Sequence, residues 1–278
     1  MKKVLSRLSL IIIAVLSAAG CFLRLFQLLR YTDNNTGLVT SNAGISYAVY
    51  AIVGVAVLAS ALYAYCQSDG KSLSAVSSSK SLYVCSILCA VSFFYDFVRQ
   101  SLSVYSYFEE NRYIEYNYIA FVILSAVSAV LSCFYMVMCA KRLSGNNFSF
   151  KSLGVFHFAP VLWAFSRLVT IMIRIVDFKE NTESCCEFVF LISFICFFFS
   201  LICAVDRQDK RISRLLYFWG TMTFFSSFII STSRLLVVLF GRQFLLYDAS
   251  FSSITYLLCG VTALCAVLCA LKEDKRII

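Results

Sequence analysis

The strongest constraint on this chain is a series of long apolar blocks separated by short polar segments. A block of about 20 apolar residues is long enough, as a helix, to cross the hydrocarbon core of a bilayer, which is about 30 Å thick. Eight blocks reach this length, at residues 8–29, 44–66, 81–101, 116–140, 153–176, 186–205, 214–240 and 251–271. The sequence therefore predicts an all-α, polytopic integral membrane protein with eight transmembrane helices in a single transmembrane domain, residues 1–278.

Composition excludes the main alternatives. Only 14% of the residues are charged, against about 25% in soluble domains, and the polar connections are too short to hold a soluble domain. The blocks are also too long and too uniformly apolar for the strands of a membrane barrel. Thirteen cysteines are present, but nearly all lie inside the apolar blocks, where thiols pack as small hydrophobic groups. We therefore expect neither a disulfide framework nor a metal site.

An internal repeat is the most informative pattern. The odd-numbered blocks align on one ionisable residue each, in "GCFLRLFQL" around Arg24, "SFFYDFVRQ" around Asp96, "WAFSRLVTI" around Arg167 and "ISTSRLLVV" around Arg234, with a spacing of about 70 residues. Each unit would be one helical hairpin, and two spans return the chain to its starting side. The pattern predicts four parallel helical-hairpin repeats, at about 1–70, 71–145, 146–210 and 211–278, with approximate four-fold or two-plus-two symmetry. Chance similarity between apolar helices is the competing explanation.

The basic residues predict the orientation. With the N-terminus inside, 15 of the 24 lysines and arginines lie at cytoplasmic helix ends and six at outer ends, as the positive-inside rule requires. Both termini are therefore expected to be cytoplasmic, in a multi-pass protein of the plasma membrane. The net charge of +9 is explained by basic residues that face the anionic headgroups of the lipid bilayer, so no nucleic-acid partner is expected.

The four aligned charges lie on helix stripes of small and polar residues. Ionisable residues within a bilayer usually face the bundle interior and have a partner. For Arg24 and Arg234, snorkelling of the side chain to the headgroups is an equally good alternative, whereas Arg167 is deeper. Asp96 is the natural counter-ion for one arginine, and Arg99 at i+3 is also within its reach.

Three arginines against one aspartate leave positive charge to be balanced. The candidates for the site, whether ligand-binding or structural ion pairs, are Arg24, Asp96, Arg99, Arg167, Arg174 and Arg234. Acidic residues near the outer starts of even-numbered helices are possible counter-charges, namely Glu115, Glu183, Glu187 and Asp248. An anionic ligand is the other way to balance the excess.

Two functional hypotheses follow. The first is a carrier or ligand-binding protein for an anionic small molecule or lipid headgroup, which would bind at the buried arginines. The second is a non-catalytic accessory or scaffold subunit, whose partner is another membrane protein and whose charges form structural salt bridges. No nucleophile with a base, metal-binding set or phosphate-binding glycine loop is found in the sequence, so an enzyme ranks third and no cofactor is expected.

The arrangement of the hairpins and the single proline are also informative. The arrangement of parallel hairpins is similar to that of mitochondrial carriers, but the proline-and-charge motif of that family is missing and the units number four instead of three, so no functional residue is carried over. The single proline, Pro160, has no N–H for the carbonyl of Phe156, and we expect it to bend the fifth helix.

Overall fold

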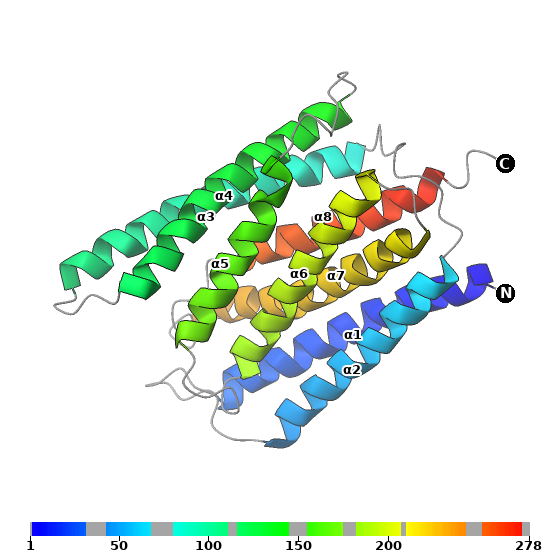
Figure 1. The fold of residues 1–278 in the computed structure, drawn as a ribbon. Coiled ribbons are helices and arrows are strands. Elements are labelled where there is room, and N and C mark those ends of the chain that lie inside the picture. Colours follow the sequence, from blue (N-terminus) through cyan, green and yellow to red (C-terminus); the bar gives the residue numbers. More distant parts are fainter. Residues whose placement is uncertain are drawn as a thin grey trace.

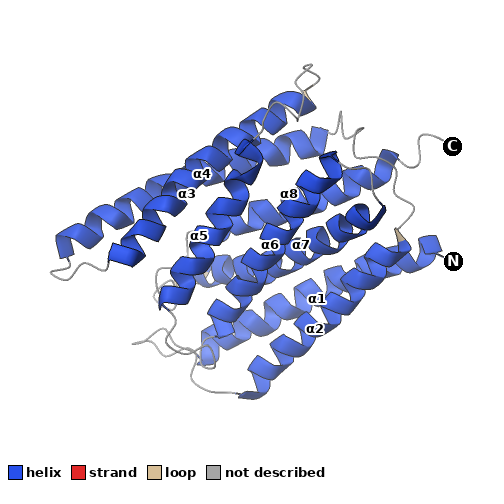
Figure 2. Ribbon diagram, in the orientation of Figure 1, coloured by secondary structure: helices blue, strands red, loops and turns tan. Residues whose placement is uncertain are grey.

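The protein is described by a computed structural model, which covers residues 2–31, 43–67, 80–110, 116–144, 155–174, 182–206, 210–242 and 252–273. These residues form helices without strands (Figure 2). The helices are α1 (Lys2–Tyr31), α2 (Ala43–Cys66), α3 (Lys80–Glu110), α4 (Tyr116–Leu143), α5 (Ala159–Arg174), α6 (Thr182–Asp206), α7 (Lys210–Leu239) and α8 (Ser252–Glu273).

The helices have the lengths and compositions of a multi-pass membrane protein. Seven helices in the described part of the chain, α1 to α7, are long and apolar enough to cross a membrane. The apolar part of α8 that is described, Ser253–Cys269, is shorter. The all-helical membrane character is therefore confirmed, and the eighth crossing stays a prediction.

Several helix boundaries differ from the expected ones, and two of these differences have clear reasons. Helix α3 continues to Glu110, nine residues past the expected end at 101, because helical backbone needs apolar side chains only where it is inside the membrane. Helix α5 begins at Ala159, after one 3-10 turn at 155–158. Pro160 therefore lies in the first turn, where its missing N–H would have no intrahelical partner in any case. Pro160 is therefore not in the helix interior as expected, because α5 begins at Ala159, and a bend at this residue stays a prediction.

Six of the helices close into a ring. Each of α3, α4, α5, α6 and α7 packs against the next helix in the chain, and α8 packs against both α7 and α3. Helices α1, α3, α5 and α7 run in one direction and the others return, so α1 begins and α8 ends at the same end of the bundle (Figure 1). The hairpins α3–α4, α5–α6 and α7–α8 therefore make up the ring.

The first hairpin lies outside this ring. Helices α1 and α2 pack against each other and both pack against α7. A four-hairpin ring would instead place α2 beside α3 and α1 beside α8, so the described contacts differ from the expected four-fold arrangement. The sequence repeat itself stays a prediction.

The apolar core has two main parts, which follow this division. The larger one fills the ring and contains Trp163, Phe93, Phe194 and Tyr256. The smaller one lies where the first hairpin meets α7 and includes Tyr63. Small residues bring α2 close to its neighbours, since Ala56, Ser60 and Ala64 are all buried.

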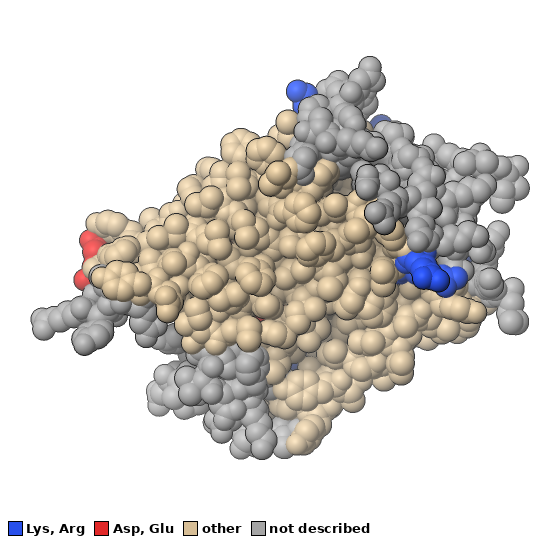
Figure 3. Space-filling model, viewed as in Figure 1, with Lys and Arg blue, Asp and Glu red and all other residues tan. Residues whose placement is uncertain are grey.

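Charged side chains separate to the two ends of the bundle. Exposed basic residues gather at the end where α1 begins, which we call the basic end, and they include Arg7, Lys80, Lys141, Arg211 and Arg214. The space-filling view shows basic atoms at this end and acidic atoms at the opposite one (Figure 3). The lateral surface between them is uncharged in this view, as a membrane-facing surface requires.

Candidate functional site

The aligned ionisable residues point into the protein. Arg24 is 2% exposed, Asp96 is 2% exposed and Arg234 is 1% exposed, while Arg167 is half-buried. The helical spacing correctly identified their faces, because residues at i−4 and i+3 share one side of a helix. For Arg24 and Arg234 the snorkelling alternative is wrong, since both side chains are enclosed by neighbouring helices.

Arg234 of α7 forms an ion pair inside the ring. Its Nη2 donates to Oε2 of Glu187 on α6 at 3.0 Å, and the Glu187 side chain is 12% exposed. Glu187 lies in the second turn of α6, which begins at the end of the bundle opposite to the basic end (Figure 1). An arginine and a carboxylate in such surroundings compensate each other for the loss of water.

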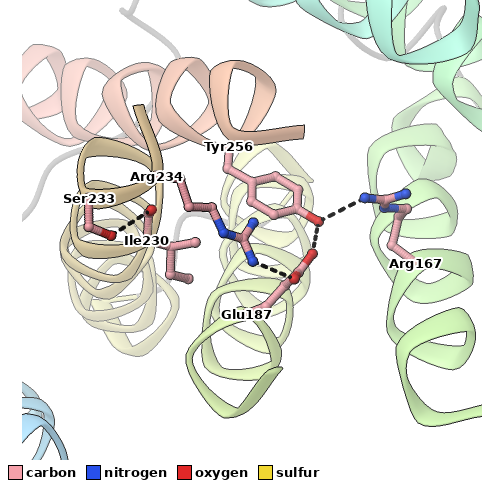
Figure 4. Close-up of polar contacts among 6 residues, drawn as sticks. All are labelled: Arg167, Glu187, Ile230, Ser233, Arg234 and Tyr256. Atoms are coloured by element: carbon pink, nitrogen blue, oxygen red, sulfur yellow. Dashed lines mark hydrogen bonds and ion pairs between the residues drawn. The ribbon is translucent and has the colours of Figure 1, made fainter. Parts of the chain in front are cut away.

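Tyr256 of α8 connects this pair to a second arginine. Its hydroxyl donates to Oε1 of Glu187, and it accepts a hydrogen bond from Nη2 of Arg167 on α5 at 3.3 Å. A hydroxyl has one proton to donate and lone pairs to accept with, so both bonds are compatible. The four residues Arg234, Glu187, Tyr256 and Arg167 therefore join α7, α6, α8 and α5 (Figure 4).

Asp96 of α3 is held by neutral donors. Its Oδ2 accepts from the indole Nε1 of Trp163 on α5 at 2.8 Å, and from Nε2 of Gln100 on its own helix at 2.5 Å. The expectation named an arginine as its counter-ion; the described hydrogen bonds of Asp96 come from an indole and an amide, and the charge of Arg167 also attracts it. Asp96 thereby fastens α3 to α5 across the ring.

Aromatic rings fill the space between these two polar groups. Trp163 packs edge-on against Phe93 at 4.9 Å and against Tyr256 at 6.0 Å between ring centroids. Tyr256 also packs on Phe190 at 4.6 Å. Trp163 and Tyr256 each combine a buried ring with a polar group bonded to a carboxylate, which is the usual condition for burying such side chains.

Arg24 belongs to a different interface. Its Nη1 donates to Oε1 of Gln27 at 2.5 Å, and Nε2 of Gln27 donates to Oγ of Ser46 on α2 at 3.0 Å. Gly20, on the same face of α1, lies so close to α7 that an added Cβ would be 2.6 Å from Cδ1 of Ile229. The described contacts of Arg24 thus hold the first hairpin together and do not join it to the cluster in the ring.

Of the other predicted site residues, only Arg99 has a described side chain. Arg99 is half-buried on α3, one turn beyond Asp96. Arg174 ends α5 and Glu183 lies in the first turn of α6, but their side chains are outside the described part of the structure. Glu115 and Asp248 also lie outside the described residues.

Three partners in the cluster were missed by sequence reasoning. Gln100 could have been found, because it lies at i+4 from Asp96, a spacing at which helical side chains meet. Trp163 lay on the stripe of Arg167, but its indole was not considered as a donor to a carboxylate. Tyr256 gave no signal, because it is one of 16 tyrosines in the chain and only packing brings it to Glu187.

The described contacts of this cluster are hydrogen bonds and one ion pair. Within the described ranges, no three residues among His, Cys, Asp and Glu gather as a metal ion would require. Its hydroxyl, carboxylates and guanidinium groups form hydrogen bonds and balance each other's charge. Arg167 is the least enclosed of the four aligned residues.

Comparisons of the chain with protein-family models, with curated proteins and with solved structures give no match.

Proposed function

We propose that this protein is a carrier or ligand-binding membrane protein for an anionic small molecule or lipid headgroup, and that Arg167 is the residue that meets the ligand. The observation that supports it most is the difference between the two arginines of the ring. Arg234 is almost fully enclosed, whereas Arg167 is half-buried and donates to the hydroxyl of Tyr256, with the charges of Asp96 and Glu187 also acting on it. The two arginines would therefore have different roles.

Arginine suits this role for geometric reasons. Its planar guanidinium carries five N–H donors in a fork that matches the oxygens of a carboxylate or phosphate. The hydrogen bond to Tyr256 fixes the orientation of the Arg167 group before a ligand arrives, which lowers the entropic cost of binding. The surrounding aromatic rings exclude water, and attraction between opposite charges is stronger in such surroundings.

The Arg234–Glu187 pair would act as the frame of the site. Glu187 accepts hydrogen bonds from both Arg234 and Tyr256, and Tyr256 in turn orients Arg167. The ligand would meet only the last member of this chain of hydrogen bonds. This division predicts that substitutions of Arg167 change binding, while substitutions of Arg234 change stability.

The experiment measures anion binding to the purified full-length protein. Inorganic phosphate and a short-chain phosphatidylglycerol are titrated by calorimetry against the wild type and the variants R167A, R167K and R30A. Arg30 is the matched control, because it is an exposed arginine of α1 at the same end of the bundle. We expect R167A to weaken binding of at least one probe by about 10- to 100-fold, the worth of a hydrogen bond to a charged group, with a smaller loss in R167K and none in R30A.

Two results would contradict the proposal. One is binding of the same strength in R167A and the wild type. The other is an equal loss in R30A, which would indicate a general effect of surface charge. Thermal unfolding of each variant shows whether the fold is kept.

The alternative is an accessory or scaffold subunit, and the enclosed Arg234–Glu187 pair favours it. In that case the cluster only locks the ring of helices together. The same titrations would then show no saturable binding of either probe to the wild type, and both R167A and R234A would act on stability or on assembly with a membrane partner.

A further inference from the structure

A second basic feature lies at the opposite end of the protein, on its surface. Helices α2 and α7 leave a shallow, open groove of about 370 Å³ between them, which we call the α2–α7 groove. Its volume is within the range of small-molecule sites, about 300–1,000 Å³. The wall is apolar and consists of Ala61, Ala64, Leu215 and Phe218.

The groove has arginines at its mouth. Arg211 and Arg214 line it from the first turns of α7 at the basic end, and both side chains are exposed. The guanidinium of Arg214 lies over the ring of Tyr65, 5.7 Å from its centroid. This cation–π contact holds the arginine beside the groove. The space-filling view shows basic atoms at the end of the bundle where α2 ends and α7 begins (Figure 3).

The surface around the groove is apolar and faces outward. Leu58 and Leu62 of α2 are 70% and 40% exposed, and Leu215 of α7 is 50% exposed. In a membrane protein such side chains contact acyl chains, while the arginines at the helix end lie at the level of the headgroups. The groove therefore has an apolar wall and two arginines near the helix end. This combination fits one phospholipid molecule, with its acyl chain along the wall and its anionic headgroup beside the arginines.

We propose that the α2–α7 groove is a binding site for an anionic phospholipid of the membrane leaflet at the basic end. Arg211 and Arg214 bind the phosphate oxygens, and the alanines of α2 leave the room in which the acyl chain lies. Anionic lipids attract basic residues near the membrane surface in general, and the groove makes this attraction local. The site is separate from Arg167 and does not depend on the function proposed above.

The lipid would also bridge two parts of the fold. Helix α2 belongs to the first hairpin and α7 belongs to the ring, and α1 and α2 pack on the ring through α7. A lipid in the groove touches both helices at the end where Nε2 of Gln67 donates to Oγ of Ser6 between α2 and α1. Bound lipid should therefore strengthen the attachment of the first hairpin.

Native mass spectrometry of the purified full-length protein tests the site. The protein is released from detergent with equal amounts of phosphatidylglycerol and phosphatidylcholine that have the same acyl chains, and the retained lipid is counted. We expect preferential retention of phosphatidylglycerol by the wild type. In R211Q/R214Q the preference should fall by at least about fivefold, the effect of losing one arginine at a membrane surface.

Three matched variants make the result specific. R7Q removes an exposed arginine at the basic end that does not line the groove, and it should keep the preference. R211K/R214K keeps the charges and should retain most of the preference. A61W fills the groove from an exposed position of α2 and should reduce retention of phosphatidylglycerol although both arginines remain.

Four results would contradict the proposal in whole or in part. An unchanged preference in R211Q/R214Q would overturn the proposal, and so would an equal loss in R7Q, because the cause would then be overall surface charge. Unchanged retention in A61W would remove the groove from the site. Displacement of the lipid by an excess of inorganic phosphate would also overturn the proposal, because the site would then bind a free anion instead of a phospholipid.

Discussion

Among the described hydrogen bonds, Arg24, Arg167 and Arg234 each donate to a different kind of group, and the kind of group affects what each arginine contributes. Arg234 bonds to a carboxylate, Arg167 to a tyrosine hydroxyl, and Arg24 to a glutamine amide. Removing one member of a buried ion pair leaves an uncompensated charge, which costs far more than the pair contributes when complete. The Arg234–Glu187 pair should therefore be sensitive to single substitutions and tolerant of a joint one.

We expect R234M to lower the free energy of unfolding by about 3–5 kcal/mol, because Glu187 stays buried without its cation. The double variant R234M/E187M should recover part of that loss, since two apolar side chains of similar length replace the pair while the Tyr256 hydroxyl loses its acceptor. Unfolding in detergent, followed by circular dichroism, measures both. A double variant no more stable than R234M would show that the charge pair itself is not what matters at this position.

For individual residues, the sequence predicted which ionisable side chains are buried better than it predicted which residues they bind. The stripe of small and polar residues around Arg24 and Arg234 identified the inward face, because that face depends only on helical periodicity. Glu187 was included among four possible counter-charges, but nothing in the sequence selected it. Which carboxylate meets Arg234 depends on how α6 and α7 are rotated against each other, and this is fixed only by packing of the whole ring.

At the scale of the helices, close contact depends on a few positions without side chains. Gly260 of α8 faces α7, where an added Cβ would lie 1.7 Å from Oγ of Ser227 and 3.3 Å from Cα of Phe224. Gly54 of α2 is the contrasting case, because an added Cβ there would meet no atom within 4 Å. Both glycines lie inside helices, so replacing either one by alanine brings the same gain in helix propensity. The two substitutions differ only in the atoms that the new methyl group meets.

G260A should destabilise the protein by about 1–3 kcal/mol, because the methyl group forces Ser227 and the backbone of α7 to move. G54A should be neutral or stabilising by up to about 1 kcal/mol, the difference in helix propensity between glycine and alanine. Thermal unfolding of the two variants under identical detergent conditions gives the comparison. Equal midpoints would mean that α7 and α8 are not in close contact at Gly260.

The existence of the helices was predictable from block length and composition, whereas their ends were less so. Helix α3 continues to Glu110 through polar and aromatic residues, and apolar content alone cannot locate the end of a helix that leaves the membrane. The position of Pro160 was visible, but its effect depended on where α5 begins. A proline in the first turn is favourable for a helix, whereas one in the interior kinks or breaks it.

At the scale of the whole molecule, the closing contact of the ring is between α3 and α8. Two pairs of thiols mark it, with sulfur atoms 3.5 Å apart for Cys85 and Cys265 and 3.7 Å apart for Cys89 and Cys259. In a four-hairpin ring α3 would instead lie beside α2, whose buried thiol is Cys66. Thiol proximity therefore distinguishes the two arrangements.

A short bifunctional thiol reagent should link Cys85 to Cys265 within one chain, and peptide mapping by mass spectrometry identifies the linked pair. The C265S variant should lose that product, which identifies Cys265 as the partner of Cys85. A product joining Cys85 to Cys66 would contradict the ring described here and favour four hairpins around one axis.

How the hairpins pack together was less predictable than the helices themselves or the burial of single residues. Adjacent helices in the chain pack together as short connections require, and this accounts for most of the ring. The contact of α8 with α3 and the position of α1 and α2 on α7 join segments far apart in the chain. Apolar helices of similar composition do not specify such pairings by sequence pattern, since side-chain packing between helices selects them.

The position of the first hairpin has a consequence for biosynthesis. Helices α1 and α2 leave the ribosome before α7, the helix they pack against in the ring, which is made about 150 residues later than α2. At translation rates of roughly 5–20 residues per second, the hairpin waits for several seconds with Arg24 in the bilayer and no α7 to cover it. Its hydrogen bonds to Gln27, and from there to Ser46, lie within the hairpin and so are available throughout that delay. The first hairpin thus carries its own means of sheltering a charge until the rest of the protein has been synthesised.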